Sequence, residues 1–244
     1  MKHKLLFTLT LVFLGFSLQA QELKKEVFEL LNLTLPGLET VKEAVKSEDY
    51  NKAAENLLIY YRNRQNVKHP EVNLKRVRIS EEEQKWADDG LKHVFFVHSG
   101  YQPSYFYGED INWEYWPVQD NELRWQLHRH KWWTPMGKAY RVSGDEKYAK
   151  EWTLQYLDWI RKNPLIKVSA AERKNLSAAE LKKLENVRYA WRPLEVSNRL
   201  QDQTNQFMLF KDSKFFTPAF LTEFLTNYYQ HAEHIIGNYS DQGN

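Results

Sequence analysis

Residues 101–133 carry the densest candidate binding chemistry in the chain, because aromatic rings are interleaved there with guanidinium, imidazole and amide groups. Sugar polymers offer apolar C–H faces that stack on such rings, and hydroxyl, carboxylate or sulfate groups that hydrogen bond to such polar groups. No single helical or strand period buries so many rings among so many polar residues. We therefore expect some of the rings to face a polysaccharide. A tryptophan-rich core between helices is the alternative interpretation.

Two arginines and a histidine suit an acidic sugar. Arg124 and Arg199 have planar guanidinium groups that bind carboxylates and sulfates in a bidentate manner. On a continuous helix, Arg124 and His128 lie four residues apart and share a face with Lys131 and Trp132. A solvated helix face is the plainer explanation of that pattern. The candidate substrate-binding residues are Arg124, His128, Arg199, Trp132 and Trp116.

Other kinds of catalytic site find little support. His231 and His234 lie three residues apart, and His128 and His130 flank Arg129, yet neither pair has the Cys or His-Glu-x-x-His partners typical of a zinc site. The sequence has no glycine-rich phosphate loop, no Gly-x-Ser-x-Gly elbow and no cysteine, which argues against phosphoryl transfer and acyl-enzyme chemistry. Neither a metal nor another cofactor is expected.

The first twenty residues have the form of a secretory signal. Lys2 and Lys4 precede an apolar run over residues 5–18, and Ala20 provides a small residue before Gln21. The signal contains two of the 34 basic residues, which leaves 32 basic residues against 32 acidic ones in the mature chain. That balance gives no electrostatic footprint for nucleic acid, and the apolar run is too short for a membrane span. Because there is no cysteine, stability must come from an ordinary core.

Helical signals recur along the chain, whereas strand signals are scarce. Ser80 and Glu83 form a capping box, Asp49 and Thr217 are N-cap residues, and Pro218 suits the first position of a helix. Antiparallel helix pairs joined by short turns predict an all-α, layered or toroidal architecture. Helices are predicted over residues 51–64, 84–93, 145–163, 217–236 and, with a bend at Pro193, 187–210; strands are predicted over 75–79 and 94–97.

Two segments between helices and one ion pair bear on where a binding site would lie in such a fold. In a helical toroid the loops at one end form the cleft, and residues 101–120 are long enough to be one of them. Residues 167–184 are rich in Lys, Glu, Ala and Ser and are predicted to be a solvated excursion. Arg192 and Glu195, three residues apart around Pro193, are expected to form an ion pair that holds two helices.

Three segments together resemble the N-terminal helical domain of heparinase II/III-type polysaccharide lyases, most closely the heparinase III branch, which acts on heparan sulfate. They are DNELRWQLHRH (120–130), WRPLEVSNRL (191–200) and NYSDQGN (238–244). The resemblance covers essentially the whole mature chain. It implies a signal peptide over 1–20, an incomplete (α/α) toroid over 21–244 that is cut short at its C-terminus, and a β-sandwich domain beyond. It also implies a periplasmic, monomeric enzyme that cleaves uronic-acid polysaccharide by β-elimination.

The resemblance also assigns one catalytic residue. In lyases of this type an asparagine binds the uronate carboxylate, on which negative charge builds when the C5 proton is removed, and a tyrosine and a histidine transfer protons. The family's asparagine follows a glycine after a long helix, and the matching residue here is Asn244. A simple turn is the alternative explanation of the same residues. The tyrosine and histidine match nothing up to residue 244, so this polypeptide alone is expected to be inactive.

Two further hypotheses remain open. The chain could be an exported binding module that grips acidic or neutral polysaccharide through residues 101–133 without cleaving it. It could also be a helical scaffold whose aromatic residues all belong to the core. Burial of Trp113, Trp116, Trp132 and Trp133 together would remove the proposed aromatic platform.

Overall fold

A computed structural model of the chain describes residues 22–64 and 72–238. The predicted signal over residues 1–20 and the candidate Asn244 lie outside these ranges. The described helices are α1 (Val27–Leu30), α2 (Glu39–Lys46), α3 (Tyr50–Asn63), α4 (Glu81–Gly90), α5 (Asn121–Leu127), α6 (Trp133–Ser143), α7 (Lys147–Lys162), α8 (Ala170–Arg173), α9 (Ala178–Ala190), α10 (Pro193–Phe210) and α11 (Pro218–Gly237). Two short strands, β1 (Val94–Phe95) and β2 (Tyr105–Phe106), pair antiparallel.

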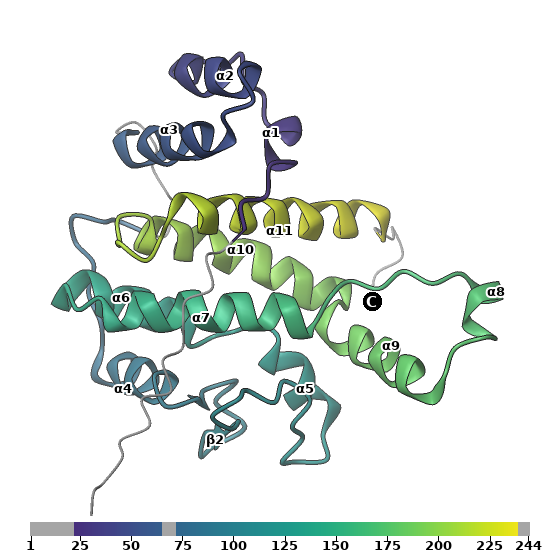
Figure 1. Ribbon diagram of the computed structural model, residues 1–244. Helices are drawn as coiled ribbons and strands as arrows, with labels where there is room; N and C mark the ends of the chain where they lie inside the picture. The colour runs from purple at the N-terminus through teal and green to yellow at the C-terminus, as the bar shows by residue number, and fades with distance from the viewer. Residues whose placement is uncertain (1–21, 65–71, 239–244) are drawn as a thin grey trace, which may run out of the picture.

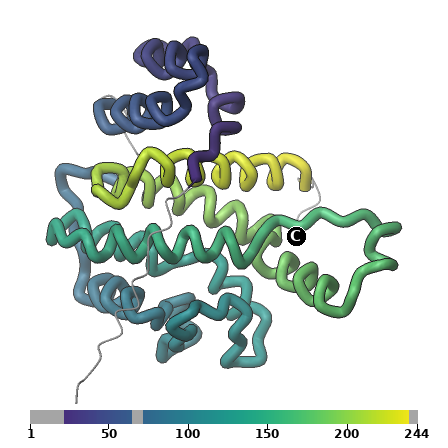
Figure 2. Tube along the Cα trace, viewed as in Figure 1, coloured from purple at the N-terminus to yellow at the C-terminus, as the bar shows by residue number. Residues whose placement is uncertain are grey.

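The fold is all-α and consists of helix pairs stacked in layers, as part of an (α/α) toroid (Figures 1 and 2). The α2/α3 pair packs on α11, α11 packs on α10, α10 packs on α6, and α6 contacts both α7 and α4. At one end of the stack, the C-terminal ends of α7 and α11 lie near the junction between α9 and α10 (Figure 1). None of the helices in the described ranges combines the length and apolar character that crossing a bilayer requires.

Local capping signals set several helix ends, as the sequence predicts. Ser80 and Glu83 form the capping box of α4, and the Asp49 side chain accepts a hydrogen bond from the backbone N–H of Lys52 at the start of α3. Thr217 caps α11 in the same way. These bonds satisfy backbone N–H groups that have no partner within the helix.

One prediction of local structure is wrong, and two others are confirmed in outline with added detail. Residues 75–79 do not form a strand. The helix expected over 187–210 is two helices, because Trp191 and Arg192 leave the helical path and Pro193 opens α10 as its first residue. Residues 167–184 are largely exposed, as predicted, but they contain α8 and the first half of α9. Capping boxes at Ser169 and Ser177 start those helices.

The centre of the core is a cluster of aromatic rings around Trp152 of α7. Its ring stacks on Phe210 at 4.2 Å between centroids and meets Phe220 of α11 edge-on at 5.2 Å. Close packing here depends on Gly137 of α6, since a Cβ atom at that position would lie 2.8 Å from the Leu209 side chain of α10. The small residue therefore sets the spacing between α6 and α10.

A second aromatic cluster lies under β1 and the start of α6. Phe95 stacks on Trp132 at 4.0 Å, and Trp132 meets Trp133 edge-on. Gln155 of α7 satisfies both indoles: its Oε1 accepts a hydrogen bond from each Nε1 at 2.9 Å, and its Nε2 donates to the Gly90 carbonyl at 2.8 Å. One buried amide thus supplies the polar partners that two buried tryptophans require.

Candidate functional site

Four of the ten Phe, Tyr and Trp rings in residues 101–133 are buried, three are half-buried, and three, those of Phe106, Tyr115 and Trp116, are exposed. Trp113 is 3% exposed, and Trp132 and Trp133 are fully buried, whereas Trp116 is 39% exposed. The prediction that Trp132 stacks on substrate is therefore wrong, because its ring packs on Phe95 and its Nε1 is bonded to Gln155. The alternative interpretation, that these tryptophans belong to the core, is thus confirmed for Trp113, Trp132 and Trp133 but not for Trp116.

The predicted cationic stripe does not form. Helix α5 ends at Leu127, His128 is its C-cap residue, and His130 adopts a left-handed backbone conformation with φ of 53°. The chain therefore turns between residue 128 and the start of α6, and Arg124 and His128 do not continue along one helical face. His128 is 1% exposed and points into the interior.

Arg199 of α10 is also buried, with 1% of its surface exposed. Its Nε donates to His231 Nε2 of α11 at 2.8 Å, and its Nη1 donates to the His128 carbonyl at 3.0 Å. Its guanidinium lies 4.6 Å from the ring centre of Trp159 and 5.4 Å from that of Trp191. These contacts are those of an internal tie between α5, α7, α10 and α11, so the prediction that Arg199 and His128 line an open cleft is wrong.

The surrounding histidines are held in the neutral form. Burial lowers the pKa of His128, His130 and His231 well below 6.5, and the nearby Arg199 charge adds to that effect. Because His231 Nε2 accepts from Arg199, the His231 proton sits on Nδ1 and is donated to the Asn227 carbonyl at 2.8 Å. Burial also lowers the pKa of Arg199 to about 9, which leaves the guanidinium charged at neutral pH.

Arg124 and Trp116 are the candidate residues that reach the surface. The Arg124 guanidinium lies 3.5 Å from the ring centre of Tyr189 in α9 and 5.3 Å from that of Trp116. Trp116 Nε1 donates to the Asp120 carbonyl at 2.9 Å. The arginine is thus held against two rings and links the loop before α5 to α9.

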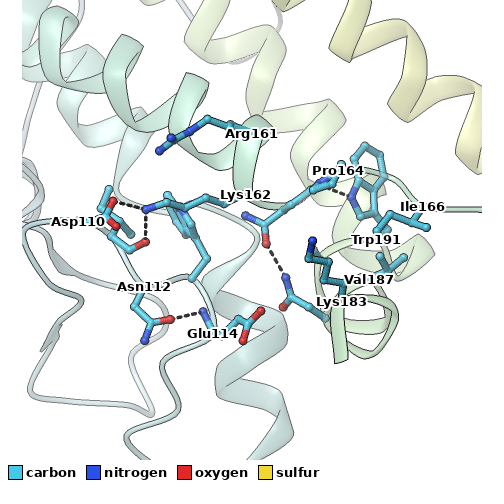
Figure 3. A pocket seen from close by; sticks show the side chains of 15 residues that line it. Asp110, Asn112, Glu114, Arg161, Lys162, Pro164, Ile166, Lys183, Val187 and Trp191 are labelled. Carbon is cyan, nitrogen blue, oxygen red and sulfur yellow. Dashed lines mark hydrogen bonds and ion pairs between the residues drawn. The ribbon is translucent and has the colours of Figure 1, made fainter. Parts of the chain in front are cut away.

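A pocket of about 630 Å³ is lined in part by Ala190, the residue that follows Tyr189. It is bounded by the C-terminal end of α7, the segment that follows it, α9 and the loop at residues 110–114 (Figure 3). Figure 3 shows Lys183 of α9 and Glu114 of the loop pointing into the same space. Lys162 is already engaged, since its Nζ contacts Asp110 and donates to the Ile111 carbonyl at 2.8 Å.

The inner wall of the pocket is built from bonded amide and indole groups. Asn163, the C-cap residue of α7, accepts from Asn186 Nδ2 at 2.8 Å through its Oδ1 and from Trp191 Nε1 at 2.8 Å through its carbonyl. Asn163 Nδ2 donates to the Trp159 carbonyl at 3.0 Å. These bonds fix the positions of Asn186 and Trp191, both of which line the pocket.

The end of α11 is tied to the same wall. His234 Nε2 donates to the Trp191 carbonyl at 2.7 Å, and Asn238 Nδ2 donates to the His234 carbonyl at 2.7 Å. Asn238 is the last described residue, six positions before Asn244. Helix α11 is therefore bonded, near its C-terminal end, to Trp191, which lines the pocket.

The remaining polar candidates have structural partners. Glu195 is fully buried and accepts from Arg129 Nη2 at 2.8 Å. The predicted pair with Arg192, at 3.7 Å, lies within the start of α10 and does not join two helices; Arg129, which follows α5, makes that connection. Within residues 22–64 and 72–238, no three His, Cys, Asp or Glu side chains gather as a metal-binding group. Lys183 and Asn186 escaped the sequence reasoning; the capping box formed by Ser177 and Glu180 was the signal that α9 begins at 178 and carries them.

Comparison with known proteins identifies relatives over most of the chain. Residues 27–244 match the family described as heparinase II/III N-terminus. The chain is 66% identical over 226 residues to a heparin-sulfate lyase of Bacteroides stercoris, covering 92% of this chain and 34% of that protein. A heparin-sulfate lyase of Pedobacter heparinus is 44% identical over 233 residues, covering 93% of this chain and 33% of the relative.

Solved structures give the same result. A heparinase III structure with methylated lysines superposes with a TM-score of 0.88 at 69% identity, over 92% of this chain and 35% of that one. The heparan sulfate lyase HepC from Pedobacter heparinus superposes with a TM-score of 0.78 at 43% identity, over 91% of this chain and 33% of that one. The chain thus spans about a third of the length of the proteins it matches.

Proposed function

Because this chain belongs to the heparinase II/III family, we propose that it is the N-terminal region of an exported polysaccharide lyase that cleaves heparan sulfate-like chains by β-elimination. The observation that carries the proposal is the 66% identity to a heparin-sulfate lyase over 92% of the chain. The chain covers 34% of that protein, and we assign the activity to a longer polypeptide to which this region contributes.

Asn244 is the residue of this chain assigned to the chemistry. Removal of the C5 proton of a uronate spreads negative charge onto a carboxylate that is already anionic, and an amide that donates hydrogen bonds to that carboxylate stabilises the charge as it develops. The tyrosine and histidine that transfer protons in such lyases are expected in the polypeptide after residue 244. The support for this placement is that α11 is bonded, near its C-terminal end, to Trp191, which lines a pocket.

The domain plan and destination of the protein complete the proposal. Residues 1–20 are a signal peptide, residues 21–244 are part of the toroid, and a β-sandwich domain follows. The protein acts as a periplasmic monomer without a cofactor, and its partner is an acidic polysaccharide rather than nucleic acid. Mass spectrometry of the exported protein tests whether residues 1–20 are a signal peptide, since the mature N-terminus should then be Gln21.

Ultraviolet absorbance of the unsaturated uronate made by β-elimination tests the activity directly. Heparan sulfate is supplied to the chain extended through its natural downstream sequence and, separately, to the 244-residue form. Product from the extended form alone is expected. In that form, Asn244→Ala should lower kcat by about 100-fold or more with little change in KM, as for loss of one oxyanion-stabilising donor. Unchanged turnover would remove Asn244 from the mechanism.

The same assay separates the lyase from a binding module. If neither form makes product while both retain polysaccharide in an equilibrium binding measurement, the region binds glycans without cleaving them. Trp116 and Arg124 would then be the first residues to substitute, because they are the surface members of the predicted binding set.

A further inference from the structure

We propose that the pocket between the end of α7, α9 and residues 110–114 is a binding subsite for one pyranose unit of the substrate chain, away from the bond that is broken. The identity of the glycan rests on the proposed function. The volume of about 630 Å³ lies within the range of roughly 300–1,000 Å³ common for small-molecule sites. Its lining joins an unpaired buried acceptor, a cation, a carboxylate and apolar side chains, which together match the groups on an acidic sugar.

Asn186 supplies the buried acceptor. Its orientation is fixed, because Asn163 Nδ2 donates to the Trp159 carbonyl, which leaves Asn163 Oδ1 to accept from Asn186 Nδ2. Asn186 Oδ1 then has no hydrogen-bond donor among the described residues, although the residue is only 7% exposed and lines the pocket. A buried acceptor without a donor is unfavourable, and a sugar hydroxyl at the inner end of the pocket is the kind of donor it lacks.

Lys183 supplies a positive charge on the α9 side of the pocket, where its charge adds to the Ser177 hydrogen bonds that lower the pKa of Glu180. Arg161, a second cation of the lining, is paired with Asp158. Lys183 is exposed and forms no salt bridge within the described part of the chain, whereas Lys162 is committed to Asp110 and the Ile111 carbonyl. Glu114 faces Lys183 across the space (Figure 3) and has Lys182 Nζ at 3.5 Å. A carboxylate or sulfate fits the Lys183 side, while hydroxyl or amide N–H groups fit the Glu114 side.

Apolar atoms complete the lining. Pro164 and Ile166, which follow α7, and Val187 and Trp191, from α9 and its C-cap, border the same space. An apolar C–H face of a pyranose ring can pack against these side chains while its edge groups meet the polar ones. This division into apolar and polar surfaces distinguishes a sugar site from a site for a small inorganic anion.

The position of the pocket fits a chain-like ligand. Trp191 lines the pocket, and its carbonyl accepts from His234 near the end of α11, the helix that leads toward Asn244. The pocket wall is therefore bonded to α11, the helix that precedes Asn244 in the sequence. Contacts in the pocket hold ground-state and transition-state substrate equally, so they should lower KM without raising kcat.

Equilibrium binding of a heparan sulfate hexasaccharide to the extended protein tests the subsite. The Asn244→Ala background slows turnover, and ultraviolet absorbance verifies that the ligand is intact. Lys183→Glu reverses the charge, and Val187→Phe fills the pocket. Arg188→Glu is the matched control, because it reverses an exposed charge on α9 that does not line the pocket.

Lys183→Glu and Val187→Phe should each weaken binding by about tenfold or more, which is the loss of one well-made contact, and Arg188→Glu should change binding less than about threefold. Circular dichroism and Tm are measured for each variant to establish that it folds. Equal weakening by Lys183→Glu and Arg188→Glu would show a general charge effect and overturn the subsite, as would wild-type binding by Val187→Phe.

Failure of the subsite is distinguishable from failure of the lyase assignment. If the wild-type extended protein makes unsaturated product but binding does not depend on residues 183 and 187, the pocket proposal falls alone. If no product forms while the Lys183-dependent binding persists, the pocket is a glycan site and the lyase assignment falls. Lys183→Ala provides a second readout, since it should raise KM for long heparan sulfate and leave kcat unchanged.

Discussion

Arg199→Ala should destabilise the fold rather than weaken substrate binding. The substitution removes two buried hydrogen bonds from a charged donor, to His231 Nε2 and to the His128 carbonyl, each worth about 1.5–3 kcal/mol. It also removes the guanidinium from beside Trp159 and Trp191 and leaves a cavity. Relief of the burial of a charge offsets part of this loss, so the net cost should be about 3–5 kcal/mol, as for other large buried side chains truncated to alanine.

Thermal unfolding of the extended protein measures this cost. A loss of about 3–5 kcal/mol corresponds to a fall in Tm of about 6–20 °C for a transition in which about 150–250 residues unfold together. Arg188→Ala is the matched control, since Arg188 is an exposed arginine of α9, and its Tm should stay within about 2 °C of the wild type. If Arg199→Ala instead keeps the wild-type Tm and raises KM for heparan sulfate, the structural role assigned to Arg199 is refuted.

Gln155→Met should cost about 3 kcal/mol or more in urea unfolding, because two indole N–H groups and the Gly90 carbonyl lose their buried partner. Gly137→Ala should cost about 1–3 kcal/mol, whereas Gly237→Ala, with open space at its Cβ, should cost nothing; equal Tm values would contradict the packing argument. Stability should be full above about pH 6.5 and fall toward pH 5, because the buried neutral histidines, such as His128 and His231, have lowered pKa values and the unfolded chain binds more protons there. A flat Tm between pH 7 and pH 5 would contradict this last prediction.

One histidine opposes that pH trend. The Glu151 side chain raises the pKa of His93 through a hydrogen bond, and the bond to the Gly108 carbonyl acts in the same direction. A raised folded-state pKa contributes stability that is present below about pH 6.5 and lost as pH rises through the folded value. His93 is one group against the buried His128, His130 and His231, so the fall in stability at low pH should dominate.

Helix positions were predictable from the sequence because their signals are local. Ser80 with Glu83, Asp49 and Thr217 each satisfy backbone N–H groups within three residues along the chain, so the sequence contains both partners of the bond. The same logic applied to Ser177 and Glu180 would have identified α9. The composition of residues 167–184 instead predicted a solvated segment, because the first half of α9 is exposed and rich in charged residues.

The fate of the aromatic residues was not predictable in that way, because their partners are distant in sequence. Trp132 resembles a ligand platform until Gln155 and Phe95 are placed around it, and both lie more than twenty residues away. The pair formed by Arg124 and Trp116 stayed at the surface, where Tyr189 supplies a third partner from α9. The residue types therefore predicted that these rings would pack against other side chains and bond to polar groups. Whether a given ring is buried or exposed depends on contacts with residues far away in the sequence.

The buried polar residues join the core to the pocket in a continuous path. Arg199 bonds to His231 of α11 and lies against Trp191; Trp191 Nε1 donates to the Asn163 carbonyl, and Asn163 in turn holds Asn186. Each step fixes a part of the pocket wall, so the wall depends on a buried charge that does not line it. The sequence does not distinguish an arginine that supports this wall from one that binds an acidic sugar. Both roles require a charged hydrogen-bond donor near the same end of the helical stack. Burial separates the two roles: the Arg199 guanidinium bonds to groups inside the protein, whereas Lys183, the cation proposed to meet the ligand, is exposed on α9.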